Sequence, residues 1–301
     1  MARPSVPGVS CDGRPSCGRV ESRRMDPIRL IAVDIDGTLL NSSFQVSAGN
    51  LQALLRAHER GVEIALVTGR RHNFALPVAE SLGFSVTLIS SNGAITRSSD
   101  GSLFHRDLLP ADIARGIVCH MAAFRGSTVL SFDREGKGAL VVETTELLNI
   151  AIRRWMEKNA EYLNVVQPLE EAVTESLVQA TFCGDIARMQ EVQQALMNSG
   201  FWERITVLRT QYEERNLCIV DVLNHGCSKG HSLRRWAEHR GIERQQVMAI
   251  GDNYNDVEML EFAGVPVIMA NACDELKQNG WMVTLGNNQD GVARAVESVL
   301  G

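Results

Sequence analysis

Two aspartates, Asp34 and Asp36, stand one residue apart at the end of the apolar run 30–33, and Gly37 and Thr38 follow at once. Side chains in an extended segment repeat every two residues, so both carboxylates can point the same way. Two like charges this close repel, so one holds a proton or a cation lies between them. The alternative explanation, a strand that ends in an ordinary aspartate turn, would account for one of the two acidic residues but not for the whole set of four. By chance, this set of four is expected in roughly one chain of this length in five hundred, so we interpret it as a site.

Polar residues also follow a second apolar run, in the sequence ALVTGRR. This run ends at Thr68, and Gly69 and Arg70 come next. A hydroxyl, an unhindered backbone N–H and the start of a helix together make a cradle for an anion. A Thr-Gly turn after a strand is common by itself, so it is weak evidence for an anion site unless it is considered together with the aspartates.

A third apolar run ends in an acidic loop, in the sequence AIGDNYND. Asp252 follows the run, and Asn255 and Asp256 lie one turn into the next helix. Capping of that helix explains one such residue but not the whole group. Carboxylates from several strand ends suit Mg²⁺, a hard cation that prefers oxygen ligands.

Lys229 stands at the beginning of a predicted helix, in the sequence HGCSKGHSL. A lysine there opposes the helix dipole, which favours anions at that end. An anion shared between the lysine and the helix would explain the position. The alternative is a solvated lysine on the surface.

Together these residue types meet the needs of phosphoryl transfer, in which positioning and neutralisation of charge dominate. A carboxylate nucleophile needs no base to activate it and forms an aspartyl-phosphate. Its own charge repels the phosphate, so we expect Mg²⁺ and Lys229 to cancel that repulsion.

The elements that must position these residues predict a parallel sheet. Short runs that are apolar on both faces are typical of parallel strands covered by helices on both sides. Helical patterns lie between them, such as 48–61, which ends at a glycine. The alternation predicts an α/β fold, a doubly wound parallel sheet. The predicted strands are 29–35, 62–68, 86–91, 247–252 and 265–270.

The middle of the chain has another pattern, in which strand-like runs suggest an open antiparallel sheet and helical patterns cover 110–124 and 185–200. We therefore expect an α+β domain inserted into the α/β domain. The start of the chain is rich in Pro, Gly, Ser and Arg and is expected to be disordered. The predicted division is 1–26 for this extension, 27–94 and 223–301 for the α/β core, and 95–222 for the inserted α+β domain.

Composition excludes several classes of protein. A net charge of −6 with 5% aromatic residues argues against a nucleic-acid partner. No apolar stretch approaches the ~20 residues that span a bilayer. Seven cysteines without a CxxC pair favour reduced thiols over disulfides or zinc. We expect a cytoplasmic protein, monomeric or weakly homodimeric, without nucleic-acid or membrane partners.

The sequence resembles the haloacid dehalogenase (HAD) superfamily, and most closely its Cof-type phosphatases, which carry a large cap after the third strand. The resemblance covers residues 28–301, and no motif position departs from the family pattern. The inserted region resembles the family in layout alone. The motifs, in chain order, are DIDGT (34–38), VTGR (67–70), SKG (228–230) and GDNYND (251–256).

The resemblance implies a role for each motif residue. Asp34 attacks phosphorus, while Asp36 protonates the leaving alcohol and later deprotonates the attacking water. Mg²⁺ is held by Asp34, the backbone carbonyl of Asp36, and Asp252. The inserted domain acts as a lid. The other implied contacts are Thr68, Gly69, Lys229 and Asn255 at the phosphate, Asp256 supporting the metal ligands, and Asn92, Gly93 and Arg70 near the substrate.

Two alternatives to a phosphatase remain at this point. A phosphomutase or another phosphotransferase of the superfamily would use the same motifs. A phospho-acceptor or binding module without enzymatic activity would share the acidic pocket, the threonine and the lysine. Such a module needs neither a large lid nor Asp36. For the phosphatase, the resemblance implies small phosphorylated metabolites, such as sugar phosphates, as substrates.

Overall fold

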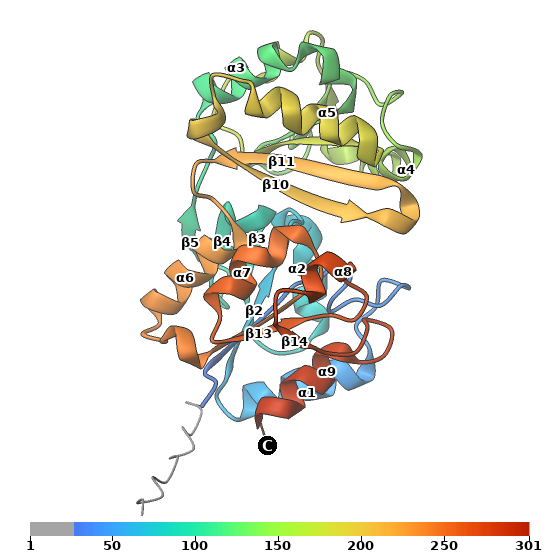
Figure 1. Cartoon of the computed structure of the whole chain (residues 1–301). Coiled ribbons are helices and arrows are strands. Elements are labelled where there is room, and N and C mark those ends of the chain that lie inside the picture. The colour runs from blue at the N-terminus through green and yellow to red at the C-terminus, as the bar shows by residue number, and fades with distance from the viewer. Residues whose placement is uncertain (1–26, 301) are drawn as a thin grey trace, which may run out of the picture.

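The protein consists of two units, each built on its own β-sheet (Figure 1). The structure, a computed structural model, describes residues 27–300. The extension predicted for residues 1–26 lies outside the described residues. No helix in the described part of the chain is long and apolar enough to cross a membrane.

The larger sheet contains eight strands among the described residues, in the order β14-β13-β12-β1-β2-β3-β4-β5. The strands from β14 to β3 are parallel, and β4 and β5 extend the sheet as antiparallel strands. The strands are β1 Leu30–Val33, β2 Glu63–Val67, β3 Thr87–Ser90, β4 Ile95–Arg97, β5 Leu103–Arg106, β12 Val247–Gly251, β13 Val265–Ile268 and β14 Met282–Val283.

Helices cover both faces of the larger sheet. Ile31 and Val33 of β1 pack in the core beneath α1, α2 and α9, and Leu30 and Ala32 pack in the core beneath α6, α7 and α8. Strands that are apolar on both faces therefore lie between two helix layers. This arrangement confirms the predicted doubly wound α/β fold. The helices are α1 Ala48–Glu59, α2 His72–Ser81, α6 Lys229–His239, α7 Val257–Phe262, α8 Asp274–Lys277 and α9 Gly291–Leu300.

The boundary of the insert at residue 95 is wrong, because β4 and β5 belong to the larger sheet. Leu88 of β3 pairs with Arg97 of β4 in an antiparallel register. These two strands mix polar and apolar residues, as antiparallel edge strands do. The prediction followed runs that are apolar on both faces, and it therefore assigned 95–106 to the insert.

The smaller sheet has the order β10-β11-β9-β6-β7-β8, and its described pairs are antiparallel except for the parallel pair of β7 and β8. Helices α3 and α5 cover the face that points away from the larger unit (Figure 1). The other face turns toward the larger unit. The elements are β6 Thr128–Ser131, β7 Leu140–Val142, β8 Leu163–Val165, β9 Gln179–Gly184, β10 Ile205–Tyr212, β11 Leu217–Asn224, α3 Ala111–His120, α4 Ile150–Lys158 and α5 Ile186–Met197.

Candidate active site

Three neighbouring parallel strands end at the same edge of the larger sheet. Asp34 follows β1, Thr68 follows β2 and Asp252 follows β12, and all three side chains are buried. The chain proceeds outward from β1 in one direction through β2 and β3, and in the other through β12 and β13. Ligands of doubly wound sheets bind at such a switch point, beyond the carboxyl ends of the strands.

Lys229 is buried between two carboxylates. Its Nζ donates to Asp34 Oδ1 at 2.6 Å and to Asp256 Oδ1 at 2.5 Å, and the side chain is 1% exposed. Burial by itself would lower the pKa of the lysine, but the two carboxylates raise it overall. The alternative of a solvated surface lysine is therefore wrong.

Asp256 holds the acidic loop in place. Besides the bond from Lys229, its Oδ2 accepts the backbone N–H groups of Asp252 at 3.0 Å and Asn253 at 3.1 Å. Three donors occupy this fully buried carboxylate. Asp256 therefore positions its neighbours in the loop, and its support of metal ligands stays a prediction.

The cluster carries more negative than positive charge. Burial raises the pKa of Asp34 to about 7, and Asp256 and Asp36 add to this while Lys229 opposes it. Burial and the charges of Asp34 and Asp256 likewise raise the pKa of Asp252 well above its ordinary value. Desolvated carboxylates that repel one another in this way favour a bound cation.

The residues present fit a divalent cation. Ligand atoms of Asp34, Asp252 and Asp256 all lie within 4.8 Å of one another. Asp252 accepts long hydrogen bonds, at 3.3 Å from Thr38 and 3.3 Å from Asn271, so its carboxylate keeps lone pairs for a metal. Because three donors occupy Asp256, Asp34 and Asp252 are the better candidate ligands for Mg²⁺.

Asp36 points to Arg70. Its two carboxylate oxygens accept from Arg70 Nε and Nη2, both at 2.6 Å. Both residues also line the cavity described below. A bidentate pair fixes the carboxylate plane, and each Asp36 oxygen keeps a second lone pair at which it can exchange a proton with another group. Arg70 lines the cavity, and its predicted position near a substrate stays a prediction.

The anion cradle is open to the cavity. Thr68 and Gly69 line it together with Asp34. The Thr68 hydroxyl oxygen accepts the backbone N–H of Arg70 at 3.1 Å, which leaves the hydroxyl hydrogen free to point elsewhere. A Cβ on Gly69 would lie 3.1 Å from Asn92 Oδ1, so glycine suits this close approach.

Asn92 and Gly93 lie behind the cavity and are not among the residues that line it. Asn92 is fully buried in the left-handed region with φ 53°, and its Oδ1 accepts from Asn255 Nδ2 at 3.0 Å. Gly93 packs on the start of α6, where an added Cβ would lie 2.3 Å from the Ser228 carbonyl oxygen. Asn255 does line the cavity, so Asn92 acts on the site through it.

Asp221 of β11 completes this network from the smaller unit, and the sequence reasoning missed it. Its Oδ2 accepts from Asn92 Nδ2 at 2.9 Å, and its Oδ1 accepts from Gln179 at 2.9 Å and Thr181 at 2.6 Å. Burial raises its pKa to about 6. The sequence did contain one signal for Asp221. A carboxylate within the apolar strand LCIVDVL is expected to be buried and therefore to need a hydrogen-bond partner.

A cavity of about 600 Å³ lies between the two units. The motif residues line one side of it, and the exposed face of the smaller sheet lines the other. The two units also contact each other around it: Asn253 exchanges two hydrogen bonds with the Gln211 backbone, each at 3.0 Å. Substrate and motif residues can thus be enclosed together.

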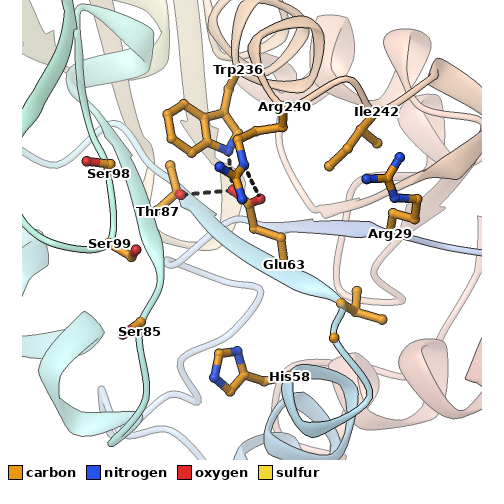
Figure 2. A pocket seen from close by; sticks show the side chains of 12 residues that line it. Arg29, His58, Glu63, Ser85, Thr87, Ser98, Ser99, Trp236, Arg240 and Ile242 are labelled. Carbon is orange, nitrogen blue, oxygen red and sulfur yellow. Dashed lines mark hydrogen bonds and ion pairs between the residues drawn. The ribbon is translucent and has the colours of Figure 1, made fainter.

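A second hollow lies at the opposite edge of the larger sheet (Figure 2). Its polar groups bond to one another: Glu63 accepts from Thr87 Oγ1 at 3.2 Å, from Arg240 Nε at 2.8 Å and from Trp236 Nε1. Figure 2 shows these side chains grouped around Glu63. The polar groups of this hollow thus find their hydrogen-bond partners within the cluster, and these bonds attach α6 to the sheet. The hollow contains no group of acidic residues comparable to that around Lys229.

The fold and the site define a class of hydrolase with a buried acidic centre and an inserted cap. The family of haloacid dehalogenase-like hydrolases matches residues 31–296. The chain is 32% identical to Phosphatase YwpJ of Bacillus subtilis, over 91% of this chain and all of that one. It is 29% identical to the HMP-PP phosphatase of Shigella flexneri, over 83% and 86% of the two chains.

Solved structures agree with this assignment. A haloacid dehalogenase-like hydrolase from Bacteroides thetaiotaomicron is 27% identical with a TM-score of 0.74, over 90% of this chain and 99% of that one. The chain therefore belongs to the haloacid dehalogenase-like hydrolases, as a Cof-type phosphatase of that family.

Proposed function

We propose that the protein is an Mg²⁺-dependent phosphatase that hydrolyses phosphate esters of small metabolites through an aspartyl-phosphate on Asp34. The observation that supports this most directly is the buried group of Asp34, Lys229, Asp252 and Asp256, of which Asp34 and Asp252 line the cavity between the two units. A nucleophile, a cation and candidate metal ligands meet there.

Asp34 is the proposed nucleophile. Lys229 holds Oδ1 at 2.6 Å, so the second oxygen, Oδ2, is the one to attack phosphorus. A bond forms between Oδ2 and phosphorus while the bond from phosphorus to the leaving oxygen breaks. Mg²⁺, when bound by Asp34 and Asp252, would neutralise charge on the carboxylate and on the phosphoryl group.

Asp36 is the proposed proton donor and acceptor. From its protonated form it gives a proton to the leaving alkoxide, which departs as an alcohol. It then takes a proton from the water that attacks phosphorus in the aspartyl-phosphate. The bond between Asp34 Oδ2 and phosphorus breaks, which releases inorganic phosphate, regenerates the Asp34 carboxylate and leaves Asp36 protonated again.

The remaining motif residues bind the phosphoryl group. The Thr68 hydroxyl and the Gly69 N–H line the cavity beside Asp34 and can donate to its oxygens, as can the Asn255 amide. Lys229 supplies positive charge from the buried side. Preorganised donors in a site shielded from water are effective because they need no reorganisation during the reaction.

Asp34→Asn tests this proposal. We expect it to lower phosphate release from acetyl phosphate in the presence of Mg²⁺ by at least about a thousandfold, because the nucleophile is lost. Asp274→Asn serves as the matched control, since that side chain is 92% exposed. Turnover by Asp34→Asn at the wild-type rate, with both variants folded by circular dichroism, would refute the mechanism.

A further inference from the structure

A third hollow, of about 390 Å³, lies where α2 and β4 of the larger unit meet the loop that follows β6 in the smaller unit. We call it the basic hollow, because four arginines and two acidic residues line it. The chain as a whole has a net charge of −6, so this positive lining is a local feature that would attract an anion. The arginines are Arg71, Arg97, Arg106 and Arg134, and the acidic residues are Asp133 and Glu135.

Two of the four arginines lack a carboxylate partner. Arg106 pairs with Asp133 at 2.6 Å, and Arg134 forms an ion pair with an acidic residue outside the lining. Among the described residues, neither Arg71 nor Arg97 forms an ion pair. Burial lowers the pKa of Arg71, and the charge of Asp133 offsets only part of this effect. A partly buried guanidinium group without a counter-ion favours a bound anion.

Three nitrogen atoms of the lining are buried without a hydrogen-bond partner among the described residues. They are Arg71 Nη1, Arg97 Nε and His72 Nδ1. The other terminal nitrogen of Arg71, Nη2, donates to the carbonyl oxygens of Phe132 at 2.9 Å and Arg134 at 3.1 Å. These bonds hold the guanidinium group in place and leave Nη1 for a ligand. Buried donors without a partner cost free energy, and a bound ion is one explanation for them.

The start of α2 adds to the positive character of the basic hollow. Arg71 is the N-cap of this helix, and in the described part of the chain its side chain makes no capping hydrogen bond. The first turn contains no acidic residue, and His72 and Asn73 of that turn line the hollow. Free backbone N–H groups and the helix dipole attract anions to such a helix end.

The basic hollow is separate from the catalytic cavity. Of the described residues that line the two, they share only Arg71. Ser131 and Gln179 of the smaller sheet line the catalytic cavity, whereas their chain neighbours Phe132 and Val178 line the basic hollow. The proposed nucleophile and the candidate metal ligands do not line the basic hollow. An anion bound there would leave the catalytic centre unoccupied.

We propose that the basic hollow is a second anion site, which binds a phosphate group through Arg71, Arg97 and His72. Guanidinium groups match the geometry of phosphate oxygens, and a phosphate group can accept hydrogen bonds from several donors at once. The inference goes beyond the phosphatase function proposed above and does not depend on it, because none of the three residues is a proposed catalytic group.

Inorganic phosphate is the probe, and equilibrium dialysis with radiolabelled phosphate in the presence of EDTA measures its binding. Without Mg²⁺ the excess negative charge of the catalytic centre should repel phosphate. We expect the wild type to bind about one phosphate per chain with a Kd of about 1 mM or less. Acetate at the same ionic strength should not displace it. Absence of phosphate binding, or equally strong binding of acetate, would overturn the inference.

Variants connect the binding to the named residues. Arg97→Gln removes a charged donor and should weaken phosphate binding at least about tenfold, whereas Arg97→Lys keeps the charge and should lose less. His72→Ala removes a second donor and tests the same site if Arg97→Gln does not fold. Arg294→Gln is the matched control, because Arg294 is an exposed arginine of α9 that lines neither cavity. Affinities of the Arg97 and His72 variants equal to that of Arg294→Gln would overturn the assignment.

Thr68→Val separates the basic hollow from the catalytic cavity. It removes the hydroxyl of the phosphate cradle, and we expect phosphate binding in EDTA to be unchanged. If Thr68→Val weakens the binding and Arg97→Gln does not, the phosphate occupies the catalytic centre. This inference then fails, while the phosphatase proposal stands. Failure of the Asp34→Asn test would overturn the phosphatase mechanism and leave the predicted binding at the basic hollow unchanged.

Discussion

The acidic centre shows how one buried cation organises several carboxylates. Lys229 binds Asp34 and Asp256 at once, and both bonds are short and inaccessible to water. Removing one partner of such a group leaves an uncompensated buried charge, which is costly. Asp34 is therefore presented in one orientation before any ligand arrives, with Oδ1 tied and Oδ2 directed elsewhere.

Asp36 should matter most after the first chemical step. Asp36→Asn cannot accept the proton of the attacking water, so we expect at least about a hundredfold slower loss of phosphate from the enzyme. After mixing with acetyl phosphate, the intact-protein mass should increase by one phosphoryl group and remain so. Asp100→Asn, in an exposed turn, should accumulate no more phospho-enzyme than the wild type. A phospho-enzyme that disappears from Asp36→Asn at the wild-type rate would contradict the role.

For single residues, the sequence was sufficient to predict those site residues whose type is suited to the chemistry and which lie at the end of a strand. Asp34, Thr68 and Asp252 could be found because each follows an apolar run, and parallel strands bring such ends together. Asp221 could not be placed in this way. Its partner Asn92 lies 129 positions away, and nothing local to either residue specifies how the smaller sheet meets the larger one.

Among the elements, the turn after β1 is tightly constrained. Gly37 has φ +82°, and a Cβ there would lie 2.2 Å from Asp252 Oδ2. The turn that directs Asp36 toward the cavity thus also touches a candidate metal ligand from β12. Glycine is required for its backbone conformation and for the space next to that carboxylate.

Gly37→Ala separates these two requirements when it is compared with Gly83→Ala. Gly83 has a similar φ of +75° but nothing within 4 Å of an added Cβ. Both variants should lose about 1–2 kcal/mol of unfolding free energy from the backbone alone. Gly37→Ala should also raise the Mg²⁺ concentration for half-maximal activity by about 10–100-fold, because Asp252 is displaced. Equal Mg²⁺ requirements in the two variants would show that the crowding has no consequence for the metal.

Element boundaries were predicted well where strands are apolar on both faces and poorly where they are not. β1, β2, β3, β12 and β13 all fall within their predicted runs. β4 and β5 have only three and four residues, and their pairing with β3 depends on the sheet already being formed. The edge hairpin is thus a product of tertiary structure, with little local signal in the sequence.

On the scale of the whole molecule, one hydrogen-bonded chain joins the two units through the site. It runs from Asn255, which lines the cavity, through Asn92 to Asp221 in β11. Asn92 adopts a left-handed backbone, so it is held in place at some cost in strain. Any movement of the smaller unit that separates Asp221 from Asn92 would reach Asn255 and the phosphate cradle.

The charge of Asp221 should therefore make stability depend on pH. Burial raises its pKa from 3.8 to about 6, opposed by the hydrogen bonds from Thr181 and Asn92 and by the charge of Lys229. A raised pKa in the folded state means that its stabilising contribution is complete below pH 3.8 and is lost as the pH rises through about 6. At about 1.4 kcal/mol per pKa unit, the loss amounts to at most about 3 kcal/mol.

Asp221→Asn removes this titration while keeping an amide in place of the protonated acid. In urea unfolding without metal or substrate, the variant should gain stability relative to the wild type by up to about 3 kcal/mol between pH 4 and about pH 7. Asp112→Asn, whose side chain is 73% exposed, should follow the wild type at every pH. A difference between Asp221→Asn and the wild type that stays constant over this range would show that Asp221 does not change its charge there. The link between the two units would then be insensitive to pH.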